Sequence, residues 1–503
     1  MSAPTIDAVT RARDAAARES WAEAYGLLRA QDAHPSRALT AADLAALADA
    51  AWWSGRVEES VTARLRAHAA FVASGDHRGA GLASWWLAHE YEALGRPATA
   101  AGWLHRAHHH LDDAPPCPEQ CLLAWTDAET AAARGDPSAA LAAARRMTAL
   151  ATRSGDAGLL ALSREAEASV LLADGRRTEA SALLDAAMRP ALAGALSGTV
   201  TGLLYDLVLT RCLEAADLGR AVEWTNAAME WTAPTWTGRP PAPLTAPAGE
   251  NPFRGVCRAH RVQVLDLLGA WALAEAEARQ ACREVPVDRP GAAAAAYYTA
   301  GEVQRRQGRA AEAAASYARA HELGRLPQPG LALLRLAQGR PEAAVAGVGL
   351  ALGRLGDPRR DLLGRARLLA ARTEVALAVG DLPGAAGAAA GLELLAGDVP
   401  LLRATADAAR GAVALAEARP EPALRLLRRA LAGWLELRVP YEAARVRVLL
   451  AAAGRAVGGE AAARRELGAA RAVFERLGAV PDARRAAALA AGGARRGSAP
   501  SSG

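Results

Sequence analysis

The sequence predicts an all-α solenoid, a stack of helical hairpins, from three observations. Four Gly-Arg or Gly-Asp pairs recur every 40 residues, at Gly55-Arg56, Gly95-Arg96, Gly135-Asp136 and Gly175-Arg176. A small residue follows five positions after each glycine, at Ser60, Ala100, Ala140 and Ala180. Glycine suits the end of a helix, where a positive φ is often needed, and an Asp at the next position, or a proline such as Pro97 or Pro137, suits the start of the next helix. A fixed period of this length is typical of stacked helix-turn-helix repeats.

The same turn recurs with altered spacing through the rest of the chain. A degenerate first copy lies around residues 20–24, and together the turns predict about twelve helical hairpins. The later turns are expected at Ala216-Asp217, Gly269-Ala270, Gly308-Arg309, Gly339-Arg340, Gly380-Asp381, Ala418-Arg419 and Gly458-Gly459.

Two intervals break this rhythm. Only 31 residues separate Gly308 from Gly339, which predicts one short helix, whereas 53 separate Ala216 from Gly269. The excess falls in residues 232–253, whose six prolines exclude a helix and predict a surface loop, either an insertion or a functional lid. We therefore expect an N-terminal array over 1–231, a Pro-rich loop over 232–253, a C-terminal array over 254–490 and a disordered tail over 491–503.

Composition limits the classes of function. The 59 basic residues are all arginine and face 54 acidic ones, a near balance that favours solvated helix faces over a nucleic-acid surface. Five cysteines in 503 residues indicate a reducing compartment. The sequence shows neither a signal peptide nor an apolar run long enough to span a membrane, so we expect a soluble, cytoplasmic protein.

The best-defined repeat unit resembles the tetratricopeptide repeat. In residues 296–320, small residues alternate with large ones at Tyr297, Gly301, Gly308, Ala313, Tyr317 and Ala320. In that repeat the small residues let two helices approach closely and the large ones fill the space between them. The resemblance implies a right-handed superhelix whose long groove binds a partner, rather than a catalytic cleft.

Three further segments resemble the tetratricopeptide regions of LuxR-type bacterial transcriptional regulators, the MalT-like group. They are residues 327–339 (PQPGLALLRLAQG), 441–445 (YEAAR) and 474–479 (FERLGA). Those regulators add a C-terminal helix-turn-helix, for which no room follows Leu489, and often a P-loop, which needs a lysine that this chain lacks. The resemblance thus implies the sensor and scaffold part alone. We expect no cofactor, no ATP hydrolysis and no sequence-specific binding to DNA.

Tryptophan marks the first candidate binding site. Seven of the twelve tryptophans lie in the first 125 residues, and Trp52, Trp85 and Trp125 fall on first-helix positions that face the groove of such a repeat. His89 and Glu129 follow one turn later. Large aromatic anchors beside a few polar groups are typical of recognition surfaces. The alternative is that these tryptophans fill an alanine-rich core.

A second candidate groove consists of charged residues in the C-terminal array, which otherwise resembles a spacer or a homodimer surface. Arginine on a groove face can clamp a carboxylate or a phosphate, although charges at helical spacing more often form solvated ion pairs. The residues are Glu302, Arg305, Arg306, Arg367 and Glu374.

A weak metal candidate completes the set. His105 and His109 share one helix face, and Cys117 and Cys121 have a similar spacing, which zinc can use. The alternative is that these histidines end a helix and interact with its negative pole. No catalytic motif was found, so we expect a scaffold or sensor that binds a protein, a peptide or a small effector. The other hypothesis is a pathway enzyme or accessory protein, which would need converging titratable groups in an enclosed space.

Overall fold

The computed structural model describes residues 8–34, 38–233, 253–285, 290–356 and 360–496. The chain divides into two compact units. The N-terminal unit comprises Met1–Val208, Ala227–Arg254 and Glu284–Arg289, and the C-terminal unit comprises Leu209–Asn226, Gly255–Arg283 and Pro290–Gly503. The division passes through α11 and α12, before the predicted array boundary at 231. Most of the predicted Pro-rich loop, residues 234–252, lies outside the described residues.

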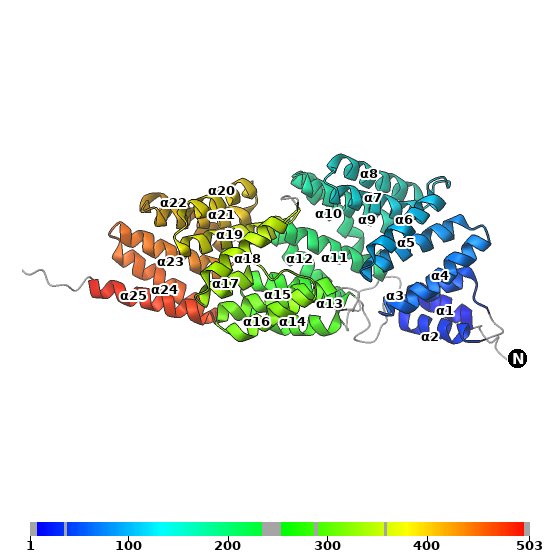
Figure 1. Ribbon diagram of the computed structural model, residues 1–503, viewed down its shortest axis with the longest axis horizontal. Coiled ribbons are helices and arrows are strands. Elements are labelled where there is room, and N and C mark those ends of the chain that lie inside the picture. The colour runs from blue at the N-terminus through cyan, green and yellow to red at the C-terminus, as the bar shows by residue number, and fades with distance from the viewer. Residues whose placement is uncertain (1–7, 35–37, 234–252, 286–289, 357–359, 497–503) are drawn as a thin grey trace, which may run out of the picture. The chain divides into compact units, whose positions relative to one another are not determined.

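Within the described ranges the chain is helical and has no strand, so the prediction of an all-α array of helical hairpins is confirmed (Figure 1). The first twelve helices are α1 (Ala8–Ala17), α2 (Trp21–Asp32), α3 (Ala41–Trp53), α4 (Val57–Ala73), α5 (His77–Ala93), α6 (Pro97–Leu111), α7 (Glu119–Ala133), α8 (Pro137–Ser154), α9 (Ala157–Ala173), α10 (Arg177–Leu192), α11 (Gly198–Glu214) and α12 (Leu218–Trp231).

The C-terminal unit continues with α13 (Arg254–Leu267), α14 (Trp271–Glu284), α15 (Pro290–Gln307), α16 (Ala310–Glu322), α17 (Gly330–Ala337), α18 (Pro341–Arg354), α19 (Leu362–Val379), α20 (Leu382–Ala396), α21 (Pro400–Ala416), α22 (Pro420–Glu436), α23 (Pro440–Ala456), α24 (Glu460–Leu477) and α25 (Val480–Arg496). The short helix predicted between Gly308 and Gly339 is α17, with 8 residues. α25 extends to Arg496, beyond the predicted boundary at 490, and residues 497–503 are outside the described part. No helix among the described residues is long and apolar enough to cross a membrane.

The predicted turns end helices because the backbone there adopts positive φ. Gly95 has φ +70° and Gly175 has φ +83°, a conformation that glycine adopts without a Cβ clash. Ala216 and Ala418 take the same role at φ +58° and +55°, at a cost of roughly 1–2 kcal/mol each for an L-residue. The next helix begins at once, because Asp136 caps the backbone N–H of Ala139.

The small residues of the repeat lie where the two helices of a hairpin touch. Ala140, Ala180 and Ala313 are fully buried, and Ala100 is nearly so. At Gly301 in α15, an added Cβ would lie 2.7 Å from the ring of Tyr317 in α16, the second helix of the same hairpin. The alternation of small and large side chains therefore sets how closely the helices approach.

Contacts far apart in sequence close each unit on itself. In the N-terminal unit, the Glu19 carboxylate accepts a hydrogen bond of 3.1 Å from the backbone N–H of Thr199, and the Phe253 ring lies 5.6 Å from that of Trp53. In the C-terminal unit α15 contacts α25, and Trp271 packs 5.3 Å from Tyr441 in one continuous core cluster.

Candidate functional site

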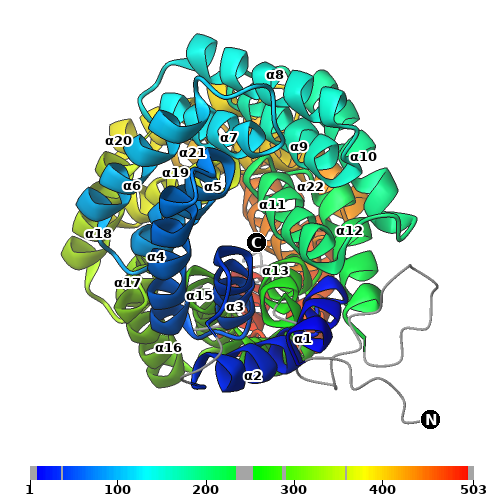
Figure 2. The same cartoon turned by 90° about the vertical axis from the view of Figure 1, so that its right-hand side faces the viewer.

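The first helices of successive hairpins contact one another, and all the groove residues predicted from sequence lie on first helices. α5 contacts α7, and α7 contacts α9, whereas α8 and α10 lie outside them (Figure 2). The same holds for α19, α21 and α23 in the C-terminal unit. We call this side of each unit its first-helix face.

Five aromatic side chains form an N-terminal aromatic cluster on this face: Trp52 and Trp53 from α3, and Trp85, Trp86 and His89 from α5. The ring of Trp86 contacts Trp52 at 6.1 Å, Trp53 at 6.5 Å and Trp85 at 5.2 Å between centroids. These edge-on arrangements are among those that aromatic pairs favour. The structure thus brings together three of the predicted residues, Trp52, Trp85 and His89.

Trp85 is held in a fixed orientation at the edge of the cluster. Its Nε1–H donates a hydrogen bond of 2.9 Å to Oγ1 of Thr126 on α7, and the imidazole of His89 stacks on it at 5.7 Å with only 6° between the planes. Trp85 is half-buried and His89 is exposed. On α7, the half-buried Trp125 adjoins Thr126, and the exposed Glu129 follows one turn later.

Trp52 differs from the expectation that it faces a groove. Only 5% of its surface is exposed, because it packs beneath Trp86 and His89. Trp86, which the sequence did not single out, is half-buried and connects the rings around it. The pairs Trp52-Trp53 and Trp85-Trp86 were visible in the sequence, but neighbouring positions on a helix point in different directions and only the packing decides which member is covered.

A buried ionic group that sequence reasoning missed supports the cluster from α4. The Glu90 side chain is fully buried, and its Oε1 accepts from Nε of Arg64 at 2.8 Å and from Oγ of Ser60 at 2.6 Å. Burial raises the pKa of Glu90, although the neighbouring guanidinium of Arg64 opposes the shift. The Arg64 guanidinium also lies 5.0 Å from the centre of the Trp86 ring, a cation–π contact.

The second predicted groove is a C-terminal ion network on the first-helix face of its own unit. We use this name for Asp266, Glu302, Arg305, Arg306 and Tyr317. Glu302 forms ion pairs with Arg305 at 2.9 Å and Arg306 at 3.3 Å, and it accepts a hydrogen bond of 2.5 Å from the Tyr317 hydroxyl. Arg306 also pairs with Asp266 on α13 at 2.6 Å.

The electrostatics of this network hold Glu302 ionised. Burial disfavours its charge, but the guanidinium groups of Arg305 and Arg306 outweigh that effect and lower its pKa to about 2. The other two predicted residues lie on α19: Arg367 is half-buried, and Glu374 pairs with Arg445 on α23 at 2.5 Å. Glu302 and Asp266 together balance the charges of Arg305 and Arg306, and the network links α13, α15 and, through Tyr317, α16.

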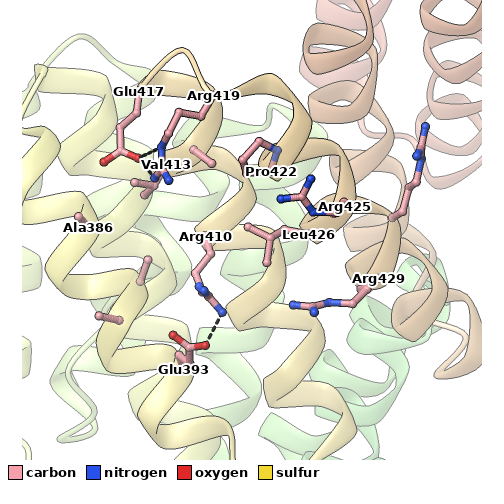
Figure 3. A pocket seen from close by; sticks show the side chains of 14 residues that line it. Ala386, Glu393, Arg410, Val413, Glu417, Arg419, Pro422, Arg425, Leu426 and Arg429 are labelled. Atoms are coloured by element: carbon pink, nitrogen blue, oxygen red, sulfur yellow. Dashed lines mark hydrogen bonds and ion pairs between the residues drawn. The ribbon is translucent and has the colours of Figure 1, made fainter. Parts of the chain in front are cut away.

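The structure also contains a groove that the sequence did not reveal, which we call the α20–α22 groove. It has a volume of about 740 Å³ and lies along α20, α21 and α22 (Figure 3). Five arginines line it: Arg410, Arg419, Arg425, Arg428 and Arg429. The residues come from three helices, so no local sequence pattern indicates their proximity.

The structure places the cysteine and histidine metal candidates in different environments. Cys117 and Cys121 are buried, whereas His105 and His109 are exposed. Among the described residues, no group of three or more His, Cys, Asp or Glu side chains is arranged to hold a metal ion. His108 instead binds Asp127 through Nε2 at 3.3 Å and Asp112 through Nδ1 at 3.2 Å, and its contact with Asp127 raises its pKa.

Comparison with known proteins places the chain in no family. No protein-family model and no curated protein matches the chain. The structure of the APC/C hetero-tetramer Cut9–Hcn1 is 12% identical over 94% of this chain and 95% of that chain, with a TM-score of 0.37. Yeast Tom70 is 12% identical over 96% of this chain and 95% of that chain, with a TM-score of 0.31. Both TM-scores are low, so the fold assignment depends on the helices and turns of this chain itself.

Proposed function

We propose that the chain is a non-enzymatic helical-repeat scaffold that binds a protein or peptide partner on the first-helix face of its N-terminal unit. The observation that carries this proposal is the fixed position of Trp85, half-exposed and held by Thr126, beside the exposed ring of His89. A rigid aromatic side chain loses little conformational entropy when it becomes covered, which makes it an effective anchor for a partner.

Trp125 and Glu129, on the next first helix α7, are the proposed continuation of this surface. Glu129 supplies a charged group one turn beyond the second anchor, so the surface combines large apolar rings with directional polar groups. Trp52 is buried beneath this surface, so it supports the exposed rings and does not contact the partner. The resemblance to the tetratricopeptide regions of LuxR-type regulators supports a regulatory role, in which occupation of this face conveys a signal to a separate protein.

Affinity purification of the tagged full chain from its native cell extract, with quantitative mass spectrometry, tests the proposal. We expect at least one protein to be retained by the wild type and lost with Trp85→Ala or Trp125→Ala. With a purified partner, each truncation should weaken binding by about 1–4 kcal/mol, the range of interface anchors. Trp103→Ala is the matched control, because Trp103 is also half-buried in this unit but lies on the second helix α6.

Retention of the same partner by both truncated variants would place the binding surface elsewhere. A small molecule that is bound at this face and chemically converted would favour an enzyme or accessory protein of a pathway instead.

A further inference from the structure

The α20–α22 groove is formed by α20 and α22, the second helices of two successive hairpins, and by α21, which lies between these two helices. It is therefore distinct from the first-helix face. Its floor is apolar and built of small side chains, including the buried residues Ala389, Val413 and Ala414. Pro422 and Leu426 on α22 continue this apolar strip. A floor of small residues allows the backbone of a bound segment to approach closely.

Positive charge surrounds the floor, and part of it is not neutralised. Arg410 pairs with Glu393, and Arg419 pairs with Glu417 (Figure 3). Arg429 pairs with Asp407 at 2.5 Å.

The two remaining arginines of the groove, Arg425 and Arg428, have no carboxylate partner in the part of the chain that the structure describes. Both are exposed, and neither forms an ion pair with any described residue. The groove therefore carries a net positive charge.

The arrangement on α22 adds direction to this charge. Pro422, Arg425, Leu426 and Arg429 follow one another at helical spacing and share one face of the helix. Arg425 and Arg429 thus flank Leu426, with Arg410 on the adjacent helix α21 (Figure 3). Like charges so close on one helix repel each other, and a bound anion would relieve that repulsion.

We propose that the α20–α22 groove binds an acidic amphipathic peptide segment of a protein partner. The apolar side of the segment covers the strip of Ala389, Val413 and Leu426, and its carboxylates pair with Arg425 and Arg428. The lining carboxylates Glu393 and Glu417 interrupt the positive surface, which disfavours the continuous phosphate backbone of a nucleic acid. This site is independent of the partner proposed for the N-terminal unit.

Fluorescence anisotropy with the purified full chain tests this proposal. The probe is a labelled peptide with leucine on one helical face and glutamate on both flanks. We expect saturable binding that weakens as salt is raised, and weaker binding of a peptide with the same composition in scrambled order. The double variant Arg425→Glu and Arg428→Glu should lose at least about tenfold in affinity, since each exchange replaces a charge-assisted contact by a repulsion.

The double variant Arg464→Glu and Arg465→Glu is the matched control. Both arginines are exposed on α24, another second helix of the same unit, and the change in net charge is identical. Circular dichroism verifies that both variants are folded, and Arg425→Gln with Arg428→Gln replaces the groove variant if it is not.

Binding that is lost in the groove variant and kept in the control supports the proposal. Three results would overturn it: no binding by the wild type, an equal loss in the control variant, or displacement of the peptide by duplex DNA or RNA. If no partner binds at Trp85, the peptide-binding result for the α20–α22 groove is unaffected. The two proposals can therefore be refuted independently.

Discussion

The first-helix faces of the two units are built from the same kind of hairpin but hold their helices together by different chemistry. In the N-terminal unit, rings from α3 and α5 pack against one another, and the ionic pair of Glu90 and Arg64 lies beneath them with the pKa of Glu90 raised. In the C-terminal unit the face is organised around the carboxylate of Glu302, whose pKa the guanidinium groups of Arg305 and Arg306 lower against the effect of burial. The repeat pattern specifies only where the helices turn and where they touch. It therefore does not determine which side chains occupy the first-helix face.

The same comparison shows that the aromatic face is suited to binding a partner, whereas the charged groups of the C-terminal face already pair with one another. The aromatic cluster ends in Trp85 and His89, which remain partly or fully exposed. The charges of Glu302, Arg305 and Arg306 are used within the C-terminal ion network. For this reason we place the first partner on the aromatic face, although both faces carried candidate residues in the sequence.

The largest expected effect is that of removing the charge at the centre of the C-terminal ion network. Glu302→Gln should destabilise the C-terminal unit by about 3–5 kcal/mol, because it leaves the guanidinium of Arg305 without its carboxylate and Arg306 with Asp266 as its remaining partner. Glu90→Gln in the N-terminal unit should cost less, since burial raises the pKa of Glu90 and so disfavours its charged form. Hydrogen exchange of α15 and α5 measures the two units separately.

Glu322→Gln is the control, because Glu322 pairs with Arg319 in α16 while both side chains are exposed, and no measurable change is expected. An equal loss of stability from Glu90→Gln and Glu302→Gln would contradict the electrostatic difference that we infer between the two faces.

A smaller effect should follow from filling the contact between the helices of a hairpin. Ala313→Leu and Ala100→Leu should each cost roughly 1–3 kcal/mol, because a larger side chain overpacks the contact. Ala313 is fully buried and Ala100 is 7% exposed, so the C-terminal substitution should be the more harmful one. Thermal melts measure the loss. Ala314→Leu and Ala101→Leu, at exposed positions one residue later in each helix, should leave the melting temperature unchanged.

The remaining expected effects concern pH, and they have opposite signs in the two units. The pKa of His108 is raised above 6.5, so its pairing with Asp127 stabilises the N-terminal unit below pH 6.5 and is lost as pH rises through the raised value. The pKa of Glu302 is lowered from 4.5 to about 2, so its contribution to the C-terminal unit is present above pH 4.5 and is lost as pH falls toward 2.

Hydrogen exchange over a range of pH, with His108→Gln and Glu302→Gln as references, checks both signs. If His108→Gln and the wild type respond alike between pH 5.5 and 9, the histidine does not contribute to the stability of the N-terminal unit.

The sequence by itself determined the hairpin array, because its signals are local. A positive φ favours glycine at the turn whatever the surroundings, an aspartate caps the helix that begins beside it, and small residues such as Ala140 and Ala180 mark where the two helices of one hairpin touch. The short α17 followed from turn spacing alone. Each of these features involves residues within one repeat.

Only the tertiary structure decided which side chains meet across repeats. It buried Trp52 while leaving Trp85 partly exposed, joined Glu374 to Arg445 on another hairpin, and assembled the α20–α22 groove from three helices. It also closed the C-terminal unit by packing Trp271 against Tyr441. The physical reason is that a periodic pattern fixes the face on which a residue lies but not the rotation and distance between neighbouring helices, and burial and ion pairing depend on both.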